Sequence, residues 1–169
     1  MLDFLRADIR VGQITKAMLQ SDYYTFVIST TTEVYLEVHV GDDRKATLTA
    51  AVDRTYCKGL VGKKCLVVCN LKPILSAGVS FSGVLLMASK ISRPQPELVQ
   101  PPDDTIPGER VGLKVQHASR LPDLVLEKTV WEKVVVDLKT NRDGIAMYRN
   151  IPLVTSKGVC RANYADADC

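Results

Sequence analysis

The residues whose types and spacing best suit a binding site lie between Asn70 and Ser82, in the sequence NLKPILSAGVSFS. An amide, a cation and a turn-forming proline stand together at Asn70, Lys72 and Pro73, and a glycine- and serine-rich loop follows between two apolar runs. Two residues can close a hairpin, so a connection of about ten residues with a cation at its base is more typical of a binding element than of a connector.

Positive charge is concentrated around this loop. The net charge of the chain is only +3, but residues 44–72 contain seven basic residues against the single acid Asp53. The seven are Arg44, Lys45, Arg54, Lys58, Lys63, Lys64 and Lys72. Such a segment is either a solvated surface or a site for a polyanion such as a nucleic acid.

Side chains for catalysis or metal binding are few. The chain has two histidines, His39 and His117, and no GxSxG, HExxH or Walker A motif. We therefore expect no enzymatic activity, no metal site and no cofactor. The five cysteines form no CxxC pair, which predicts reduced thiols, with Cys65 and Cys69 as small residues on one face of a strand.

Short apolar or alternating runs in the first half predict β-strands. They fall at residues 9–15, 23–30, 33–40, 45–52, 64–71 and 81–89. In the run 33–40, alternation places Val34 and Leu36 on a buried face and Tyr35 and His39 on a solvent face. Five or six strands with one short helix predict a small closed or nearly closed barrel, mainly all-β.

A second part of the chain follows a proline-rich boundary at residues 94–107, which contains five of the eight prolines. The spacing of apolar residues in 126–141 predicts a helix, and Arg149 and Asn150 predict a two-residue hairpin turn. The last eight residues, ANYADADC, are typical of a mobile acidic tail. We predict a barrel at 1–93, and a linker and small α/β appendix at 94–169 that packs on it.

Four stretches in fixed order carry a resemblance to a known family. They are ADIRVGQITKA, GLVGKKCLVVCNLKPILSAGVSFSGVLLMAS, QPPDDTIPGERV and VWEKVVVDLKTN…GIAMYRNIPLVTSKGVCRA. Together they resemble the EMAP II-like tRNA-binding domain, which also occurs as a C-terminal extension of aminoacyl-tRNA synthetases. The resemblance implies a five-stranded OB-fold barrel that recognises the shape of tRNA, and an appendix that takes the place of a dimer partner, so that the chain is a monomer.

The resemblance also implies partners. They are tRNA and an aminoacyl-tRNA synthetase, fused or in trans, for which the chain is a non-catalytic accessory module; the cytoplasm is the location expected from the composition of the N-terminus. No apolar run reaches the length of about 20 residues that spans a membrane, and the early acids and arginines of the N-terminus argue against a signal peptide.

The resemblance assigns tRNA contacts to Asn70 and Lys72 in the NLKP turn and to Lys45 and Thr49. Asn70 is equally well explained as an amide that caps a turn, whereas a lysine at a loop base neutralises phosphate directly.

The chain departs from the family at Phe81, where a serine is usual. Phe81 either stacks on a base or fills the core, and Ser80 and Ser82 flank it as further candidates. Four further residues are candidates for tRNA contacts on the basis of charge alone, and each could instead be a solvated surface residue. They are Lys63, Lys64, Lys90 and Arg93. Tyr23 and Tyr24, in a first loop that lacks the family's usual histidine-proline pair, either stack on nucleotides or pack.

Two other functions remain open at this point. The segment RVGQIT at 10–15 resembles one associated with cytokine-like activity, which gives a protein-interaction or signalling domain as the alternative. The same residues also predict the first barrel strand. A third alternative is an assembly scaffold that recruits synthetases through its C-terminal surface.

Overall fold

The computed structural model describes residues 3–19, 31–53, 59–76, 78–114 and 120–169. A curled antiparallel sheet follows the order β3-β2-β1-β4-β7. Its strands are β1 (Ile9–Leu19), β2 (Thr31–His39), β3 (Lys45–Asp53), β4 (Lys64–Val68) and β7 (Val84–Leu85). The Ser82 N–H donates a 2.9 Å hydrogen bond to the Thr47 carbonyl and draws the two edges of the sheet together. The prediction of a nearly closed OB-like barrel is confirmed.

The interior of the barrel is built by the alternation seen in the sequence. Val34, Leu36 and Val38 of β2 are buried in the barrel core, and they meet Leu48 of β3 and Val67 of β4 there. The intervening residues of β2 point outward, where Tyr35 lies opposite Thr49 in register. The outer face of β2 and β3 is therefore the free surface of the barrel.

Two small hairpins extend from the barrel. The long loop after β4 is itself a hairpin of β5 (Ile74–Ser76) and β6 (Val79–Phe81), and β8 (Met87–Lys90) pairs with β9 (Arg93–Leu98). The strand predicted at 81–89 is thus divided among β6, β7 and β8. The predicted boundary between residues 93 and 94 falls inside the β8–β9 hairpin. The division of the chain into two parts there stays a prediction.

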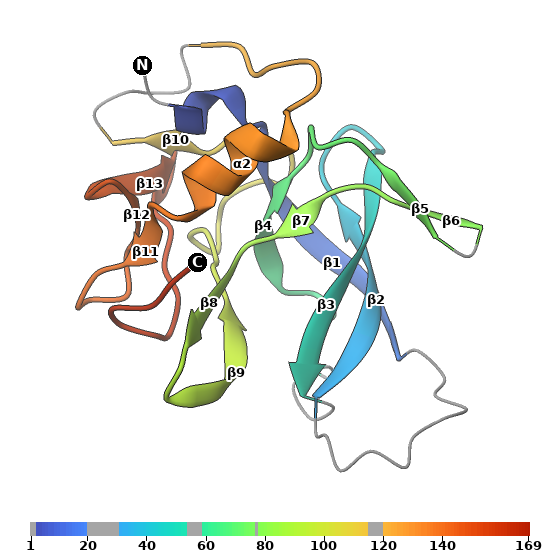
Figure 1. Ribbon diagram of the computed structural model, residues 1–169, viewed down its shortest axis with the longest axis horizontal. Helices are drawn as coiled ribbons and strands as arrows, with labels where there is room; N and C mark the ends of the chain where they lie inside the picture. The colour runs from blue at the N-terminus through green and yellow to red at the C-terminus, as the bar shows by residue number, and fades with distance from the viewer. Residues whose placement is uncertain (1–2, 20–30, 54–58, 77, 115–119) are drawn as a thin grey trace.

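The C-terminal part forms a second layer beside the barrel (Figure 1). Its elements are β10 (Gly112–Leu113), α2 (Lys128–Val135), β11 (Leu138–Thr140), β12 (Ala146–Tyr148), β13 (Ile151–Thr155) and β14 (Gly158–Val159), and the short helix η1 (Asp3–Arg6) joins them. Ile9 of β1 and Leu66 of β4 share one buried cluster with Leu113, Trp131 and Leu153. Strands β1 and β4 are therefore covered on both faces, and the predicted packing of the appendix on the barrel is confirmed.

The predicted helix is present but shorter than expected, whereas the predicted hairpin turn is found as expected. The helix ends at Val135, shorter than predicted, because β-branched valines are weak helix formers and Leu138–Thr140 pairs with β12 instead. The turn is confirmed, since Arg149 and Asn150 have positive φ angles of 48° and 64°, which a tight hairpin turn requires.

The prediction of a mobile acidic tail is wrong. Asp168 exchanges backbone hydrogen bonds with Ser89, and its carboxylate lies 3.2 Å from the Lys139 ammonium. Ala167 is buried. Backbone hydrogen bonds and the buried Ala167 side chain thus hold the C-terminal residues against the rest of the protein. Composition alone does not reveal these contacts. No helix in the described ranges is long and apolar enough to cross a bilayer.

Candidate functional site

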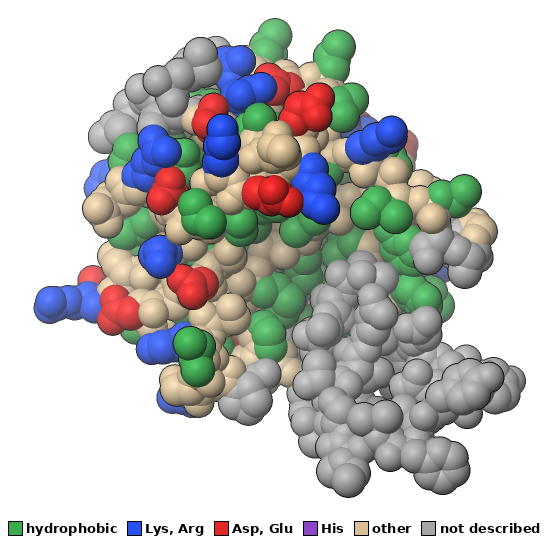
Figure 2. Space-filling view, viewed as in Figure 1, with side chains coloured by type: hydrophobic (Ala, Val, Ile, Leu, Met, Phe, Trp, Pro, Cys, Tyr) green, Lys and Arg blue, Asp and Glu red, His purple; other side chains and the backbone are tan. Residues whose placement is uncertain are grey.

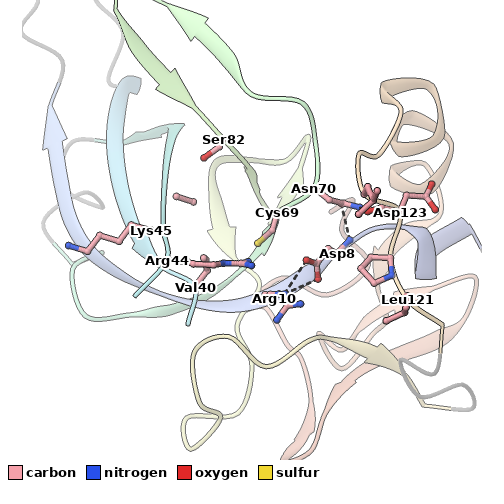
Figure 3. Close-up of a pocket in the computed structure, with 13 residues that line it drawn as sticks. Asp8, Arg10, Val40, Arg44, Lys45, Cys69, Asn70, Ser82, Leu121 and Asp123 are labelled. Atoms are coloured by element: carbon pink, nitrogen blue, oxygen red, sulfur yellow. Dashed lines mark hydrogen bonds and ion pairs between the residues drawn. The ribbon is translucent and has the colours of Figure 1, made fainter. Parts of the chain in front are cut away.

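A cleft of about 680 Å³ lies where the start of β3 and the end of β4 face the loop 121–124 (Figure 3). We call it the basic cleft, because Arg10, Arg44 and Lys45 line it. Asn70 and Ser82 line it as well, so the fold brings together three of the predicted residues, Lys45, Asn70 and Ser82.

The three cations of the basic cleft differ in how far they are neutralised. Arg10 Nε donates to both carboxylate oxygens of Asp8, at 2.9 and 3.1 Å, and Arg10 Nη1 donates to the Gly108 carbonyl at 3.0 Å. Lys45 Nζ lies 3.1 Å from Glu37 Oε1, and hydrogen bonding from Lys45 is the first cause that holds the pKa of Glu37 below its ordinary value.

Arg44 is the cation whose charge is left available. Its side chain has no ion pair with the residues that the structure describes, and Figure 3 shows it extending across the cleft toward Cys69 while Lys45 points away. The Arg44 N–H donates to the Gly41 carbonyl at 2.8 Å, which fixes the turn that carries it. Sequence reasoning counted Arg44 within the basic segment but did not select it as a site residue.

Asn70 has every hydrogen-bonding group of its amide engaged inside the protein. Its Oδ1 accepts from the Asp8 N–H at 2.9 Å, and its Nδ2 donates to the carbonyls of Arg6 and Asp123 at 3.0 and 2.9 Å. The Asn70 carbonyl also accepts from the Leu126 N–H. The side chain therefore fastens the end of β4 to both the N-terminal segment and the loop that forms the far wall of the cleft.

The remaining lining of the basic cleft combines a hydroxyl, an apolar rim and two carboxylates, Asp8 and Asp123, each of which already pairs with arginines. Ser82 is half-buried, and its hydroxyl makes no hydrogen bond to any described residue. Leu121 and Leu124 line the opposite side with side chains that are 84% and 99% exposed. The cleft thus offers one ligand a hydroxyl, an apolar wall and Arg44, a cation without an ion pair among the described residues.

A second cleft of about 550 Å³, which we call the apolar cleft, separates the β5–β6 hairpin and β7 from α2. Lys72, Ile74, Phe81, Met87 and Trp131 line it among others. In the view of Figure 2, apolar side chains gather on the side of β5, β6 and β7, whereas charges of both signs are interspersed over α2.

Phe81 lies between this cleft and the outer face of the barrel. It is half-buried, and its ring stacks on Tyr35 of β2 with the centroids 5.5 Å apart and the planes at 25°. Phe81 is therefore not part of the barrel core. Alternation along β2 predicted that Tyr35 faces outward, but no sequence signal connected it with Phe81.

The other predicted residues lie outside the two clefts. Ser80 is exposed on β6 opposite Leu75, and Thr49 occupies β3 with its side chain outside what the structure describes. Lys90 and Arg93 face each other across the β8–β9 turn. Tyr23 and Tyr24 lie outside the described residues.

Three of the charge-based candidates have neighbours within the protein. Arg93 lies 5.8 Å above the Tyr164 ring centroid. Lys64 Nζ donates to the carbonyls of Asp103 and Thr105, and Lys63 also has a protein contact. Because of these contacts, the three side chains are less available to a ligand than Lys72. Lys72 is exposed and has no partner among the described residues.

The four described cysteines are free thiols: Cys65, Cys69, Cys160 and Cys169. Burial raises the pKa of Cys69 to about 11 and that of the other three to about 12. They stay protonated at neutral pH, so they are neither nucleophiles nor ready metal ligands. Within the described ranges, no three His, Cys, Asp or Glu side chains are grouped to hold a metal ion.

The curled five-stranded antiparallel sheet has the architecture of an oligonucleotide-binding (OB) barrel. Residues 27–110 match a family described as a putative tRNA-binding domain, and this part of the chain belongs to that family. The family predicted from the sequence motifs is confirmed, and it is a binding family rather than a catalytic one.

Individual relatives extend the similarity to almost the whole chain. The cytoplasmic methionine–tRNA ligase of Arabidopsis thaliana is 32% identical over 161 residues, which are 94% of this chain and 19% of that protein. The mouse aminoacyl tRNA synthase complex-interacting multifunctional protein 1 is 29% identical over 95% of this chain and 50% of its own length. The chain therefore spans half of these relatives or less.

A solved structure shows the same fold. The C-terminal domain of Plasmodium vivax p43 superimposes with a TM-score of 0.83 at 24% identity, and the match covers 99% of both chains. The arrangement of barrel and C-terminal layer is thus shared as a unit.

Proposed function

We propose that this chain is an accessory tRNA-binding module that holds the tRNA backbone in the basic cleft and serves an aminoacyl-tRNA synthetase in cis or in trans. The observation that carries the proposal is the Arg44 guanidinium, which has no ion pair within the described part of the chain and is directed into a cleft that Lys45 and Ser82 also line. A guanidinium presents a rigid fork of donors that matches phosphate oxygens. The tRNA-binding family and the synthetase-related names of the relatives support the same function.

Each lining residue has a distinct part in this proposal. Arg44 pairs with a phosphate directly, and Lys45 exchanges its ion pair with Glu37 for a second phosphate. The Ser82 hydroxyl donates to a phosphate or a ribose. Asn70 acts through position, because its own amide is fully engaged.

The proposed contacts go to the backbone, so recognition is largely independent of sequence. Lys72 and Phe81 form a second contact area, and Thr49, Ser80, Lys90 and Arg93 are proposed as outer contacts. Because the C-terminal layer covers β1 and β4 on their outer face, we further propose that the module is a monomer. A cytoplasmic location follows from the proposed service to a cytoplasmic synthetase.

Fluorescence anisotropy with several unrelated labelled tRNAs tests the function. We expect comparable affinities for all of them, and an equal loss of affinity for each on Arg44→Ala. Lys128→Ala is the matched control, since Lys128 is an 87% exposed cation on α2 that lines neither cleft. Absence of tRNA binding at low salt contradicts the proposal, and so does equal loss from both substitutions.

The signalling alternative finds no support in the geometry. Residues 10–15 lie within β1, where Val11 and Ile14 are fully buried and both strand edges are hydrogen-bonded over much of the segment. This segment would have to leave the sheet to meet a receptor. A synthetic peptide of these residues that acts on responsive cells without nucleic acid would restore the alternative.

A further inference from the structure

Phe81 and Ser82 are neighbours in the chain, yet their side chains enter different clefts. Ser82 lines the basic cleft and Phe81 lines the apolar cleft. The backbone between them is fixed by the hydrogen bond from the Ser82 N–H to the Thr47 carbonyl. A polynucleotide bound at Ser82 is therefore already beside the mouth of the apolar cleft.

The ring of Phe81 is held in place from one side. Tyr35 stacks on it with a centroid distance of 5.5 Å, and Phe81 also lines the apolar cleft. Ile74 lies opposite Phe81 in the β5–β6 ladder and also lines the cleft. A planar ligand would meet a rigid aromatic surface there rather than a rotating side chain.

The apolar cleft has one cation among mostly apolar lining residues. Lys72 is exposed and has no ion pair with the described residues, while Val84, Met87 and Trp131 supply apolar surface. A ligand that matches this lining has a flat, largely apolar body and one anionic group. A nucleotide whose base is not paired has this composition, and its volume suits a cleft of about 550 Å³.

We propose that the apolar cleft takes one unpaired nucleotide of the bound RNA, with its base against Phe81 and its phosphate on Lys72. This inference rests on the proposed function, because it extends the RNA path from the basic cleft past Ser82. A base inside a duplex is stacked and cannot enter, so the apolar cleft distinguishes single-stranded from double-stranded segments.

Trp131 provides a direct readout. It lines the apolar cleft and is the one tryptophan of the chain. A base that enters the cleft should quench its fluorescence. The probes are a stem-loop RNA with an adenosine-rich single-stranded loop and the same stem as a blunt duplex. We expect quenching by the stem-loop and little quenching by the duplex.

Variants separate the residues involved. Phe81→Leu keeps an apolar side chain without a ring and should abolish the quenching and weaken stem-loop binding about 5- to 100-fold, whereas Phe81→Tyr should retain both. Lys72→Ala should lower the salt dependence of log Kd by about 0.7, and Lys128→Ala should change neither readout. Thermal unfolding of each variant checks that the fold is kept.

The outcomes distinguish the two proposals. Salt-dependent tRNA binding without Trp131 quenching, or quenching that survives Phe81→Leu, overturns the nucleotide site and leaves the basic cleft intact. Loss of all RNA binding in the unaltered protein overturns both. If an apolar peptide quenches Trp131 and RNA does not, the cleft is a protein-docking site instead.

Discussion

Gly41 and Gly108 pack backbone against backbone and join the β2–β3 turn to the segment after the proline-rich stretch. A Cβ on Gly41 would lie 2.7 Å from the Gly108 Cα, and a Cβ on Gly108 would lie 2.8 Å from the Gly41 Cα. The Gly108 N–H donates to the Val11 carbonyl at 2.7 Å, and the Gly41 carbonyl accepts from Arg44. This contact therefore sets the position of the cation that defines the basic cleft.

Gly108→Ala should destabilise the fold for two reasons, the close contact and the positive φ of 99°. We expect a loss of about 3 kcal/mol in the free energy of unfolding, measured by urea denaturation. Gly62→Ala is the control, because Gly62 has a φ of 90° and nothing within 4 Å of its added Cβ. It should cost only about 1 kcal/mol. Equal losses in both variants would show that the close contact is unimportant.

Asn70→Asp tests the positioning role of the amide with almost no change in shape. The carboxylate would place an oxygen where Nδ2 now donates to two carbonyls, so a part-buried network loses both donors. We expect a loss of at least about 2 kcal/mol in unfolding free energy. Under conditions where the variant is folded, its tRNA affinity should fall less than that of Arg44→Ala. An unfolding free energy equal to that of the unaltered protein would contradict the positioning role.

The ion pair between Lys45 and Glu37 predicts a measurable pKa. Hydrogen bonding from Lys45, assisted by Thr15, lowers the pKa of Glu37. A carboxylate with a lowered folded pKa stabilises the fold above its unfolded pKa of about 4.3, and this contribution is lost as the pH falls through the folded pKa. In Lys45→Ala, the Glu37 pKa measured by carboxyl NMR should rise toward the ordinary value. An unchanged value would remove Lys45 as the cause.

The raised thiol pKa values predict slow alkylation of the folded protein. With the pKa of Cys69 at about 11, its thiolate fraction at pH 8 is about a thousandth, compared with about a quarter for an ordinary thiol. In a Cys57→Ser background, Ellman's reagent should react slowly with the native protein and rapidly after denaturation. Rapid reaction of Cys69 in the native protein would contradict the burial described above.

The sequence predicted those features that depend on local pattern. Alternation located β2 and its buried face, and the turn residues Arg149 and Asn150 located the β12–β13 hairpin. The predictions failed where distant contacts decide the outcome, since Asp168 pairs with Ser89 in a segment whose composition suggested disorder. The same limit applies to the site. Lys45, Asn70 and Ser82 were predicted separately, but only the fold shows that they share a cleft with Arg44.

The salt dependence of tRNA affinity tests the central claim, that the basic cleft neutralises backbone phosphates, most directly. The slope of log Kd against log salt reports the number of phosphate contacts. In the double variant Arg44→Ala and Lys45→Ala, the slope should fall by about 1.4 to 1.8, while Lys128→Ala should leave it unchanged. A double variant with the unaltered slope would contradict the account, because the phosphates would then be bound elsewhere on the chain.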